Sequence, residues 1–211
     1  MRSYEVAARM QLGAPPIANE SSESEATRRL YGTDGEHTAS LARNCPLARR
    51  LVERGEPFVL IYRGSSGKSW DAQTNLTKNH VEMAREYDRP VAGLLADLAG
   101  SGLLDDTVVL GVTEFGRSPV SQGSGDSAGR HHHPSCFSCW MAGGGVPSGR
   151  TYGPSDEVGY RPAANPVTIY DLHATALHLL GLDHERLTFY HNGVNRRLTD
   201  VHGHVMDGLI A

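Results

Sequence analysis

The sequence predicts a single α/β domain, residues 1–211, in which helices flank a mostly parallel sheet. Three short runs of apolar, β-branched or aromatic residues have the pattern of buried strands, at 58–62, 107–112 and 136–142. Apolar residues at helical spacing predict helices at 46–54, 90–99 and 172–180. Strand, helix and strand in this order predict a βαβ unit with a right-handed crossover, which brings the carboxyl ends of the first two strands to one edge of the sheet.

Composition narrows the function classes. The chain has 211 residues, 39% of them hydrophobic, which is enough for a substantial core. A net charge of -4 and the lack of any Lys/Arg-rich run argue against a nucleic-acid partner. No run approaches the roughly 18 apolar residues of a membrane span, and no targeting signal is seen, so we expect no membrane partner and, for the chain as given, a cytoplasmic location. Three cysteines are too few for a disulfide framework.

Residues 1–35 are expected to form a polar N-terminal extension. Within it, Ser22 and Glu25 have the spacing of a capping box and predict a short helix over 23–31. The helix over 46–54 has Pro46 suited to its first turn. We expect its arginines on the solvated face: Arg49, Arg50 and Arg54.

A carboxylate follows the first predicted strand. The intervening Gly67-Lys68-Ser69 resembles the end of a phosphate-binding loop. That motif requires a glycine five positions before Gly67, where this chain has Tyr62, so we exclude a phosphate-binding loop. Asp71 is the residue of interest. It either serves as a ligand at the strand end or stabilises an Asx turn or helix cap, and its spacing leaves both open.

The second predicted strand ends in a similar way. The run of 107–112 leads directly to Glu114 and Arg117, and ligands bind at the carboxyl ends of strands in open α/β sheets. Because the βαβ unit places both strand ends at one edge, we expect Asp71 and Glu114 to share one crevice.

Three consecutive histidines, His131, His132 and His133, follow in a Gly- and Ser-rich loop. Neutral imidazoles beside carboxylates suit Zn, Mn or Fe, although neighbouring residues on an extended segment point in different directions and at most two could bind one ion. A solvated polar loop is the alternative. Cys136 and Cys139 form a CxxC sequence. Residues three apart in a strand face opposite sides, so the two thiols cannot bind one ion together, and we expect both cysteines to be core residues.

The C-terminal third is predicted from turn and cap signals. Residues 143–166 form a long Gly/Pro-rich loop, a candidate for covering a site. Asp171 is expected to cap the helix over 172–180, and Asn192-Gly193 is a hairpin signal. Asp200 is expected to cap a short terminal helix.

Seven segments carry a resemblance to a known family. In order, they read NCPLARRLVERG, WDAQTNL, LLDDTVVLGVTEFGRSP, GRHHHP, MAGGGV, YGPSDEVGY and YDLHATALHLLGLDHERLTFYHNG. They resemble the DUF1501 family of bacterial sulfatase-like proteins, which belongs to the alkaline phosphatase-like superfamily. The resemblance implies an alkaline phosphatase-like α/β sandwich, a divalent metal (Zn, Mn, Ca or Mg) and hydrolysis of phosphate or sulfate esters. It also implies an exported or periplasmic location.

The resemblance further implies which residues bind the metal. Superfamily ligands correspond to Asp71, to Glu114 and to a histidine that we assign to His132. Two positions depart from the family pattern, since Gln73 stands where members usually have His and His131 where they usually have Asp. The chain resembles the C-terminal half of the family, so we expect it to lack the segment that supplies the nucleophile.

Two function classes remain open. In the first, the chain is a metal-assisted hydrolase of small-molecule esters, in which the proposed ligands hold an ion that polarises the scissile group and activates water. The candidate catalytic residues are Arg117, Arg130 and His133, with Arg117 or Arg130 pairing with an anionic substrate oxygen. In the second, the chain is a truncated or degenerate domain with a structural or interaction role. Because a half-fold exposes apolar surface, we expect a homo-oligomer in either case.

Overall fold

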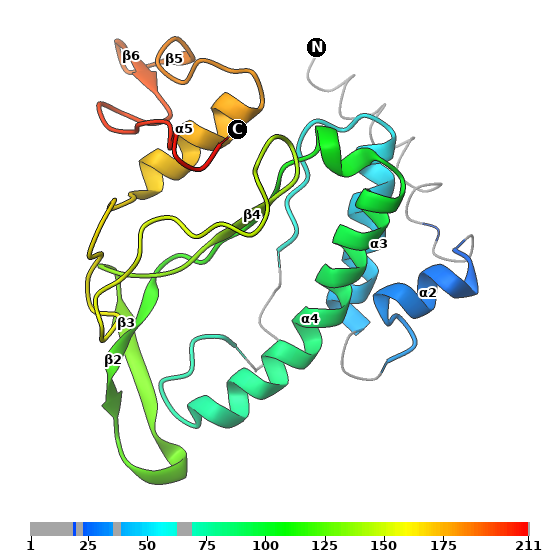
Figure 1. Cartoon of the computed structure of the whole chain (residues 1–211), viewed down its shortest axis with the longest axis vertical. Coiled ribbons are helices and arrows are strands. Elements are labelled where there is room, and N and C mark those ends of the chain that lie inside the picture. The colour runs from blue at the N-terminus through cyan, green and yellow to red at the C-terminus, as the bar shows by residue number, and fades with distance from the viewer. Residues whose placement is uncertain (1–18, 20–22, 36–38, 63–68, 211) are drawn as a thin grey trace. The chain divides into compact units, whose positions relative to one another are not determined.

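The computed structural model describes residues 19, 23–35, 39–62 and 69–210 and divides the chain into two compact units, Met1–Leu103 and Leu104–Ala211. In the described ranges, the first unit contains helices and the second contains the strands together with one longer helix (Figure 1). None of the helices in these ranges has the length and apolar character needed to cross a membrane.

Three helices make up the described part of the first unit: α2 (Glu25–Tyr31), α3 (Ala39–Glu53) and α4 (Leu76–Gly100). Each contacts the other two. Their buried side chains form a small core that includes Tyr31, Leu41, Ala42, Cys45, Ala48, Met83, Leu94 and Leu98. Gly93 allows the close approach of α4 to α2, because a Cβ at this position would lie 3.0 Å from the carbonyl oxygen of Leu30.

Two helices of this unit, α3 and α4, are longer than predicted. Pro46 lies inside α3 rather than in its first turn, and Pro90, where the predicted helix over 90–99 begins, lies inside α4. The N-cap of α2 is Ser24, whose hydroxyl accepts the backbone N–H of Thr27. The predicted cap, Ser22, lies outside the described residues. A proline removes one N–H without stopping a helix that packing stabilises on both sides, so the local proline rule misplaced these boundaries.

The predicted mostly parallel sheet flanked by helices is wrong. In the described residues, every sheet has two antiparallel strands: β1 with β4, β2 with β3, and β5 with β6. Residues 58–62, predicted as the first core strand, belong to none of them. Their apolar pattern has no neighbouring strand in the described part of the chain, and a β-forming sequence without a partner does not make a strand.

The other two predicted strands are present but shorter. β1 (Val109–Gly111) pairs with β4 (Trp140–Ala142), and Gly111 opposes Trp140, whose ring fills the space where a side chain on Gly111 would lie. Between them the chain forms a hairpin, β2 (Gly116–Gln122) and β3 (Gly129–His133), with no helix longer than one turn. The hairpin brings the chain back antiparallel, so β1 and β4 are not parallel neighbours. The predicted βαβ unit, which joined 58–62 to 107–112 through a helix, and its shared strand edge are also wrong, because 58–62 forms no strand.

The remaining elements of the second unit are α5 (Ile169–Leu179) and a second hairpin, β5 (Thr188–His191) with β6 (Val194–Arg197). This hairpin confirms its turn signal, since Asn192 and Gly193 both have positive φ, 50° and 80°. The described residues also contain two short one-turn helices, η2 (Leu103–Asp106) and η3 (Gly125–Ser127). No helix follows Asp200 within the described residues, so the predicted terminal helix is wrong.

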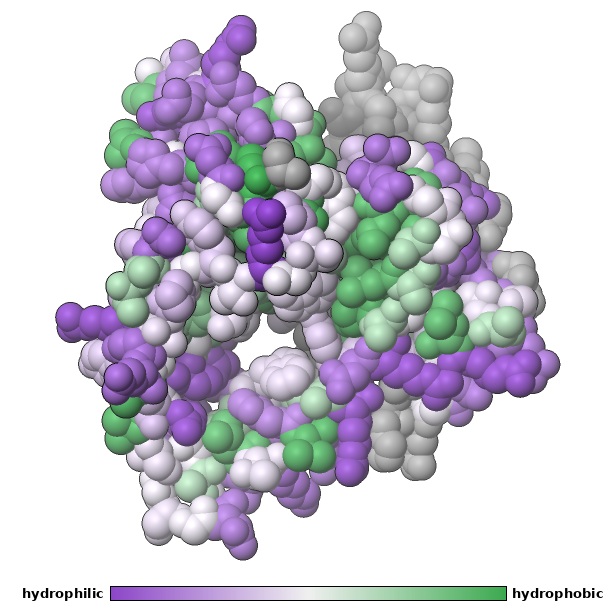
Figure 2. Space-filling view, in the orientation of Figure 1, coloured by the Kyte–Doolittle hydropathy of each residue, from purple (hydrophilic) through white to green (hydrophobic). Residues whose placement is uncertain are grey.

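Hydrophobic side chains also reach the surface of the molecule. Figure 2 shows hydrophobic residues interspersed with hydrophilic ones on the viewed face. Several large apolar side chains are more than two-thirds exposed: Phe58, Leu60, Tyr62, Val120, Val158, Tyr190 and Val201, at 67–78%, with Val158 the least exposed. Three of these seven belong to the single segment 58–62.

Candidate functional site

The β2–β3 hairpin carries most of the residues predicted as a site. Glu114 lies two residues before β2, Arg117 lies within β2, and Arg130, His132 and His133 lie within β3. Arg117 stands directly opposite His132 in the register of the two strands. Because side chains alternate along a strand, His132 and Arg130 share one face of the hairpin with Arg117, and His133 belongs to the other face.

Glu114 and Arg117 form an ion pair at the start of this hairpin. Nη2 of Arg117 lies 3.3 Å from Oε1 of Glu114, and the Thr113 hydroxyl donates to Oε2 at 2.7 Å. The Thr113 hydrogen bond is the main reason that the pKa of Glu114 lies below its usual value, with partial burial opposing it and Arg117 adding to it. The carboxylate is therefore held ionised while its side chain stays 58% exposed.

Aromatic and backbone contacts fix the guanidinium and imidazole groups of the same face. The guanidinium carbon of Arg117 lies 5.2 Å from the centre of the Phe115 ring, and that ring lies 4.4 Å from the ring of His132. Nη1 of Arg117 also donates to the carbonyls of Phe115 and Gly116. Arg130 donates from Nη1 to the carbonyl of Ser118 at 2.9 Å. The result is a pre-arranged surface with two guanidinium groups, one imidazole and one carboxylate.

His133 makes a different set of contacts. Its side chain is buried, its Nε2 lies 2.6 Å from the carbonyl oxygen of Tyr160, and the two rings are 4.7 Å apart. Tyr160 belongs to a turn that Asp156 organises, because the Asp156 carboxylate accepts the backbone N–H groups of Val158, Tyr160 and Arg161. His133 thus attaches part of the long loop 143–166 to the hairpin, a positioning contact that the sequence pattern did not reveal.

The two cysteines of the CxxC sequence are not core strand residues. Cys136 is half-buried, Cys139 is exposed, and both lie in the segment between β3 and β4. Both are free thiols, and partial burial raises the pKa of Cys139. The expectation of two core cysteines is therefore wrong, because the strand that was predicted over 136–142 begins only at Trp140.

The described residues contain no group of three or more His, Cys, Asp or Glu side chains that could hold a metal ion. Of the three predicted ligands, Glu114 and His132 belong to the second unit, and Asp71 belongs to the first. Asp71 is exposed in a turn before α4, where its backbone N–H donates to the hydroxyl of Ser69. Carboxylate and imidazole are suitable donors for a divalent ion, but in the described residues no third such side chain joins Glu114 and His132.

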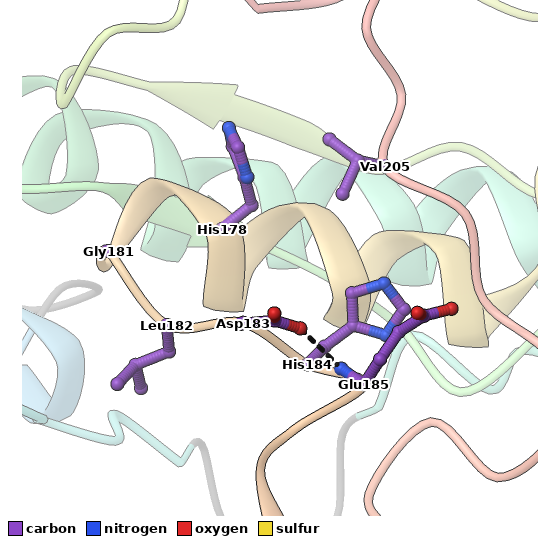
Figure 3. A pocket seen from close by; sticks show the side chains of 7 residues that line it. All are labelled: His178, Gly181, Leu182, Asp183, His184, Glu185 and Val205. Atoms are coloured by element: carbon purple, nitrogen blue, oxygen red, sulfur yellow. Dashed lines mark hydrogen bonds between the residues drawn. The ribbon is translucent and has the colours of Figure 1, made fainter.

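A separate pocket of about 450 Å³ lies at the C-terminal end of α5 (Figure 3). Its lining residues are His178, Gly181, Leu182, Asp183, His184, Glu185 and Val205. His184 is buried, and its Nδ1 lies 2.9 Å from the hydroxyl of Thr199, which is fully buried. Asp183 accepts the backbone N–H groups of Glu185 and Arg186 and so stabilises the turn that forms one wall. None of these residues was predicted as a site from the sequence.

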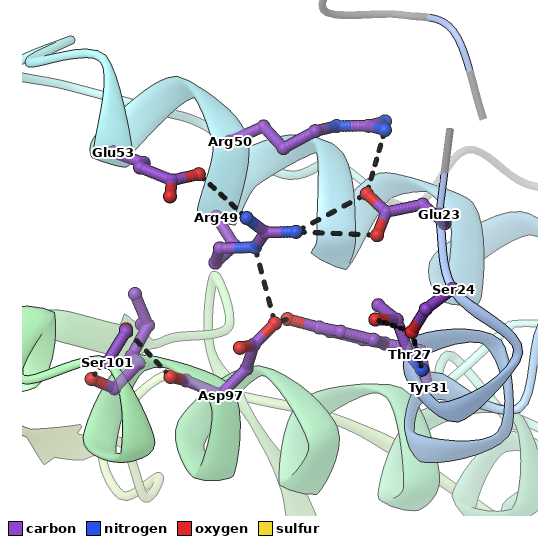
Figure 4. Close-up of polar contacts among 10 residues, drawn as sticks. Glu23, Ser24, Thr27, Tyr31, Arg49, Arg50, Glu53, Asp97 and Ser101 are labelled. Carbon is purple, nitrogen blue, oxygen red and sulfur yellow. Dashed lines mark hydrogen bonds and ion pairs between the residues drawn. The ribbon is translucent and has the colours of Figure 1, made fainter. Parts of the chain in front are cut away.

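A dense polar cluster lies between the helices of the first unit (Figure 4). Arg49 contacts three carboxylates, with Nη2 3.3 Å from Glu23, Nη1 2.7 Å from Glu53 and Nε 3.2 Å from Asp97. Arg50 donates to the same Glu23 at 2.8 Å, and its side chain is 10% exposed. The prediction that the arginines of this helix face solvent is therefore wrong for Arg49 and Arg50. It is correct only for Arg54, which is exposed.

Tyr31 completes this cluster. Its hydroxyl donates to Oδ2 of Asp97 at 2.8 Å, and burial followed by this hydrogen bond raises the pKa of the tyrosine. The cluster joins α2, α3 and α4 through hydrogen bonds and ion pairs. It has the composition of a structural network, because each of its carboxylates faces an arginine.

Comparison with known proteins gives one match. A family model described as "Protein of unknown function (DUF1501)" matches residues 1–210. No curated protein and no solved structure matches the chain.

Proposed function

Because the chain belongs to the DUF1501 family, we propose that it is a hydrolase of ester bonds, acting on phosphate, sulfate or related esters in the manner of the alkaline phosphatase-like superfamily. The reaction takes place at the face of the β2–β3 hairpin that carries Arg117, Arg130 and His132. Its substrate is a small molecule with an anionic group.

The grouping of Glu114, Arg117 and His132 supports this proposal most directly. Strand pairing sets Arg117 opposite His132, and the ion pair with Glu114 orients the guanidinium. A guanidinium that is already oriented loses little entropy when it binds an oxyanion, and its planar donors match the oxygens of a phosphate or sulfate group. Arg130, held by the carbonyl of Ser118 on the same hairpin, supplies a second positive charge for such an anion.

We also propose that this site binds a divalent metal ion. Glu114 and His132 would supply two of its ligands, and Asp71 is the third ligand predicted from the sequence. When bound, such an ion polarises the scissile group and lowers the pKa of a coordinated water. Both oxygens of Glu114 already accept hydrogen bonds, from Thr113 and Arg117, but a carboxylate has further lone pairs with which to bind a cation.

The second candidate function is a non-catalytic domain with an interaction role. Two observations favour it. The described residues hold no group of three potential metal ligands, and segment 58–62 exposes three large apolar side chains. A domain of this kind would bind a partner through apolar surface and would hydrolyse nothing.

Activity measurements on the full chain separate the two candidates. We expect hydrolysis of at least one aryl phosphate, sulfate or carboxylic ester, measured with and without added Zn, Mn, Ca or Mg. We expect Arg117→Met to lower kcat/KM by about ten- to a hundredfold, since a hydrogen bond between charged groups contributes about 1.5–3 kcal/mol. Arg150→Met is the matched control, because Arg150 is exposed and lies outside the hairpin.

The metal is tested on the same proteins. We expect elemental analysis of protein purified without chelator to find bound divalent metal, and Glu114→Ala and His132→Ala to reduce its amount. Metal content that neither substitution changes, together with no turnover of any of the esters, would leave the interaction domain as the better description. Turnover that survives chelator but falls in Arg117→Met would retain the hydrolase and remove the metal from it.

A further inference from the structure

Segment 58–62, with the sequence FVLIY, is an apolar and exposed segment in the described part of the first unit. Phe58, Leu60 and Tyr62 are 76%, 75% and 78% exposed, while Val59 and Ile61 between them are half-buried. The alternation is that of an extended strand, with one face turned to solvent. That solvent-facing side consists of large hydrophobic residues, which a stable monomer rarely leaves uncovered in a cluster.

The backbone of this segment is available for pairing. It belongs to no helix or sheet, and no backbone hydrogen bond joins it to another described residue. All five of its side chains are apolar, and four of them are β-branched or aromatic, the residues that favour strands. An extended, unpaired and apolar segment is a template for strand addition from another chain.

The order of the five residues identifies the partner strand. Read from either end, the segment runs aromatic, β-branched, leucine, β-branched, aromatic. In an antiparallel pair of two such strands centred on Leu60, Phe58 of one copy opposes Tyr62 of the other, and Val59 opposes Ile61. Aromatic and β-branched cross-strand pairs are among those that stabilise antiparallel sheets.

We propose that residues 58–62 form an antiparallel strand pair with the same residues of a second copy of this chain, with Leu60 on the two-fold axis. The interface is isologous, since each contact occurs twice and Leu60 meets itself. The exposed side chains of both copies, which are Phe58, Leu60 and Tyr62, then lie on one face of the two-stranded ribbon, where they contact one another.

The area of the contact sets the expected strength. Five residues from each copy bury less surface than the roughly 1,200–2,000 Å² of a stable interface. We therefore expect a reversible dimer with a dissociation constant on the order of 10 µM. Sedimentation velocity should show a monomer at low concentration and a dimer as the concentration rises through this value.

A lysine substitution on the axis tests the interface directly. Leu60→Lys places two ammonium groups opposite each other in the ribbon, and like charges in directly opposed positions destabilise strand pairs. Because Leu60 is 75% exposed, the change leaves the fold of the monomer intact. Val201→Lys is the matched control, since Val201 is 74% exposed in the other unit. We expect Leu60→Lys to remain monomeric at concentrations where both wild type and Val201→Lys dimerise.

Disulfide crosslinking tests the register. In a background with the exposed Cys139 changed to serine, we expect Leu60→Cys to form a disulfide-linked dimer on mild oxidation. Directly opposed Cα atoms in antiparallel strands lie about 4.5–5.5 Å apart, which a disulfide spans. Phe58→Cys alone should not crosslink, because its two copies are displaced by four residues along the ribbon, roughly 13 Å. Mixed with Tyr62→Cys protein, it should form a heterodisulfide.

Several results would overturn the proposal. The first is a wild-type chain that stays monomeric up to about 100 µM, ten times the expected dissociation constant. The second is a Leu60→Lys protein that dimerises like wild type. The third is a Phe58→Cys protein that crosslinks to itself as well as Leu60→Cys does. Assemblies larger than a dimer would likewise contradict it, because they indicate open-ended strand addition rather than a closed two-fold pair.

Discussion

Replacing Arg49 with methionine is expected to lower the free energy of unfolding of the first unit by about 2–3 kcal/mol. The side chain of Arg49 is 16% exposed and contacts Glu53 of its own helix, Asp97 of α4 and Glu23, which precedes α2. Methionine fills much of the same volume but removes the positive charge. The two most buried of the three carboxylates, Glu23 at 12% and Asp97 at 26% exposed, then lose a charged partner in a place with little solvent.

The measurement is denaturant unfolding followed by helix content, with Arg29→Met as the matched control. Arg29 also forms an ion pair within this unit, with Glu25, but its side chain is 64% exposed. Exposed ion pairs contribute roughly 0–1 kcal/mol, so we expect the control to unfold nearly as wild type does. Equal effects of the two substitutions would show that the cluster around Arg49 contributes no more than a surface pair.

Replacing Asp171 with alanine is expected to destabilise the second unit by about 2 kcal/mol at neutral pH. The buried carboxylate accepts the backbone N–H and the hydroxyl of Thr168, each at 2.7 Å, and so forms the capping box of α5. Its other oxygen accepts the backbone N–H of His204 at 2.7 Å and holds the C-terminal segment against the helix. Alanine leaves these donors without an acceptor. Asp207→Ala is the matched control, since Asp207 is exposed.

The effect of Asp171 depends on pH in a predictable direction. Burial raises the pKa of this carboxyl group, but the hydrogen bonds from Thr168 and His204 outweigh burial and leave the pKa below its usual value. A carboxyl group with a lowered pKa in the folded state stabilises that state above its unfolded pKa, about 3.9. This stabilisation is lost as the pH falls through the folded-state pKa. The difference in unfolding free energy between wild type and Asp171→Ala should therefore shrink below about pH 4, and a constant difference would contradict the assignment.

Local signals in the sequence predicted the features whose cause is local. The Asn192-Gly193 turn is an example, because positive φ at two successive residues is nearly sufficient to form a tight hairpin. The helix near 172–180 also formed, although its N-cap is Thr168, with Asp171 three residues inside as the capping-box partner. Membership of the DUF1501 family was likewise readable from the motifs, and the family match over residues 1–210 confirms it.

Part of the candidate site could also be predicted from the sequence. Glu114 and Arg117 are close in the chain, so their ion pair required only a turn before β2. The pairing of Arg117 with His132 required the hairpin, where the sequence predicted a loop. Its β2 strand has a register irregularity between Arg117 and Ser121 and contains Pro119, and neither feature follows the alternating pattern by which strands are recognised.

Tertiary structure decided which segments remain without a pairing strand and which charges are buried. The run at 58–62 has the composition of a core strand, yet it lacks a neighbouring strand in the described residues, and composition carries no information about a partner. Arg49 and Arg50 occupy positions typical of a solvated helix face, but carboxylates from distant residues enclose them. His133 is buried because Tyr160, 27 residues later, folds back onto it. Contacts over such separations depend on the path of the whole chain, so a local pattern of residues cannot specify them.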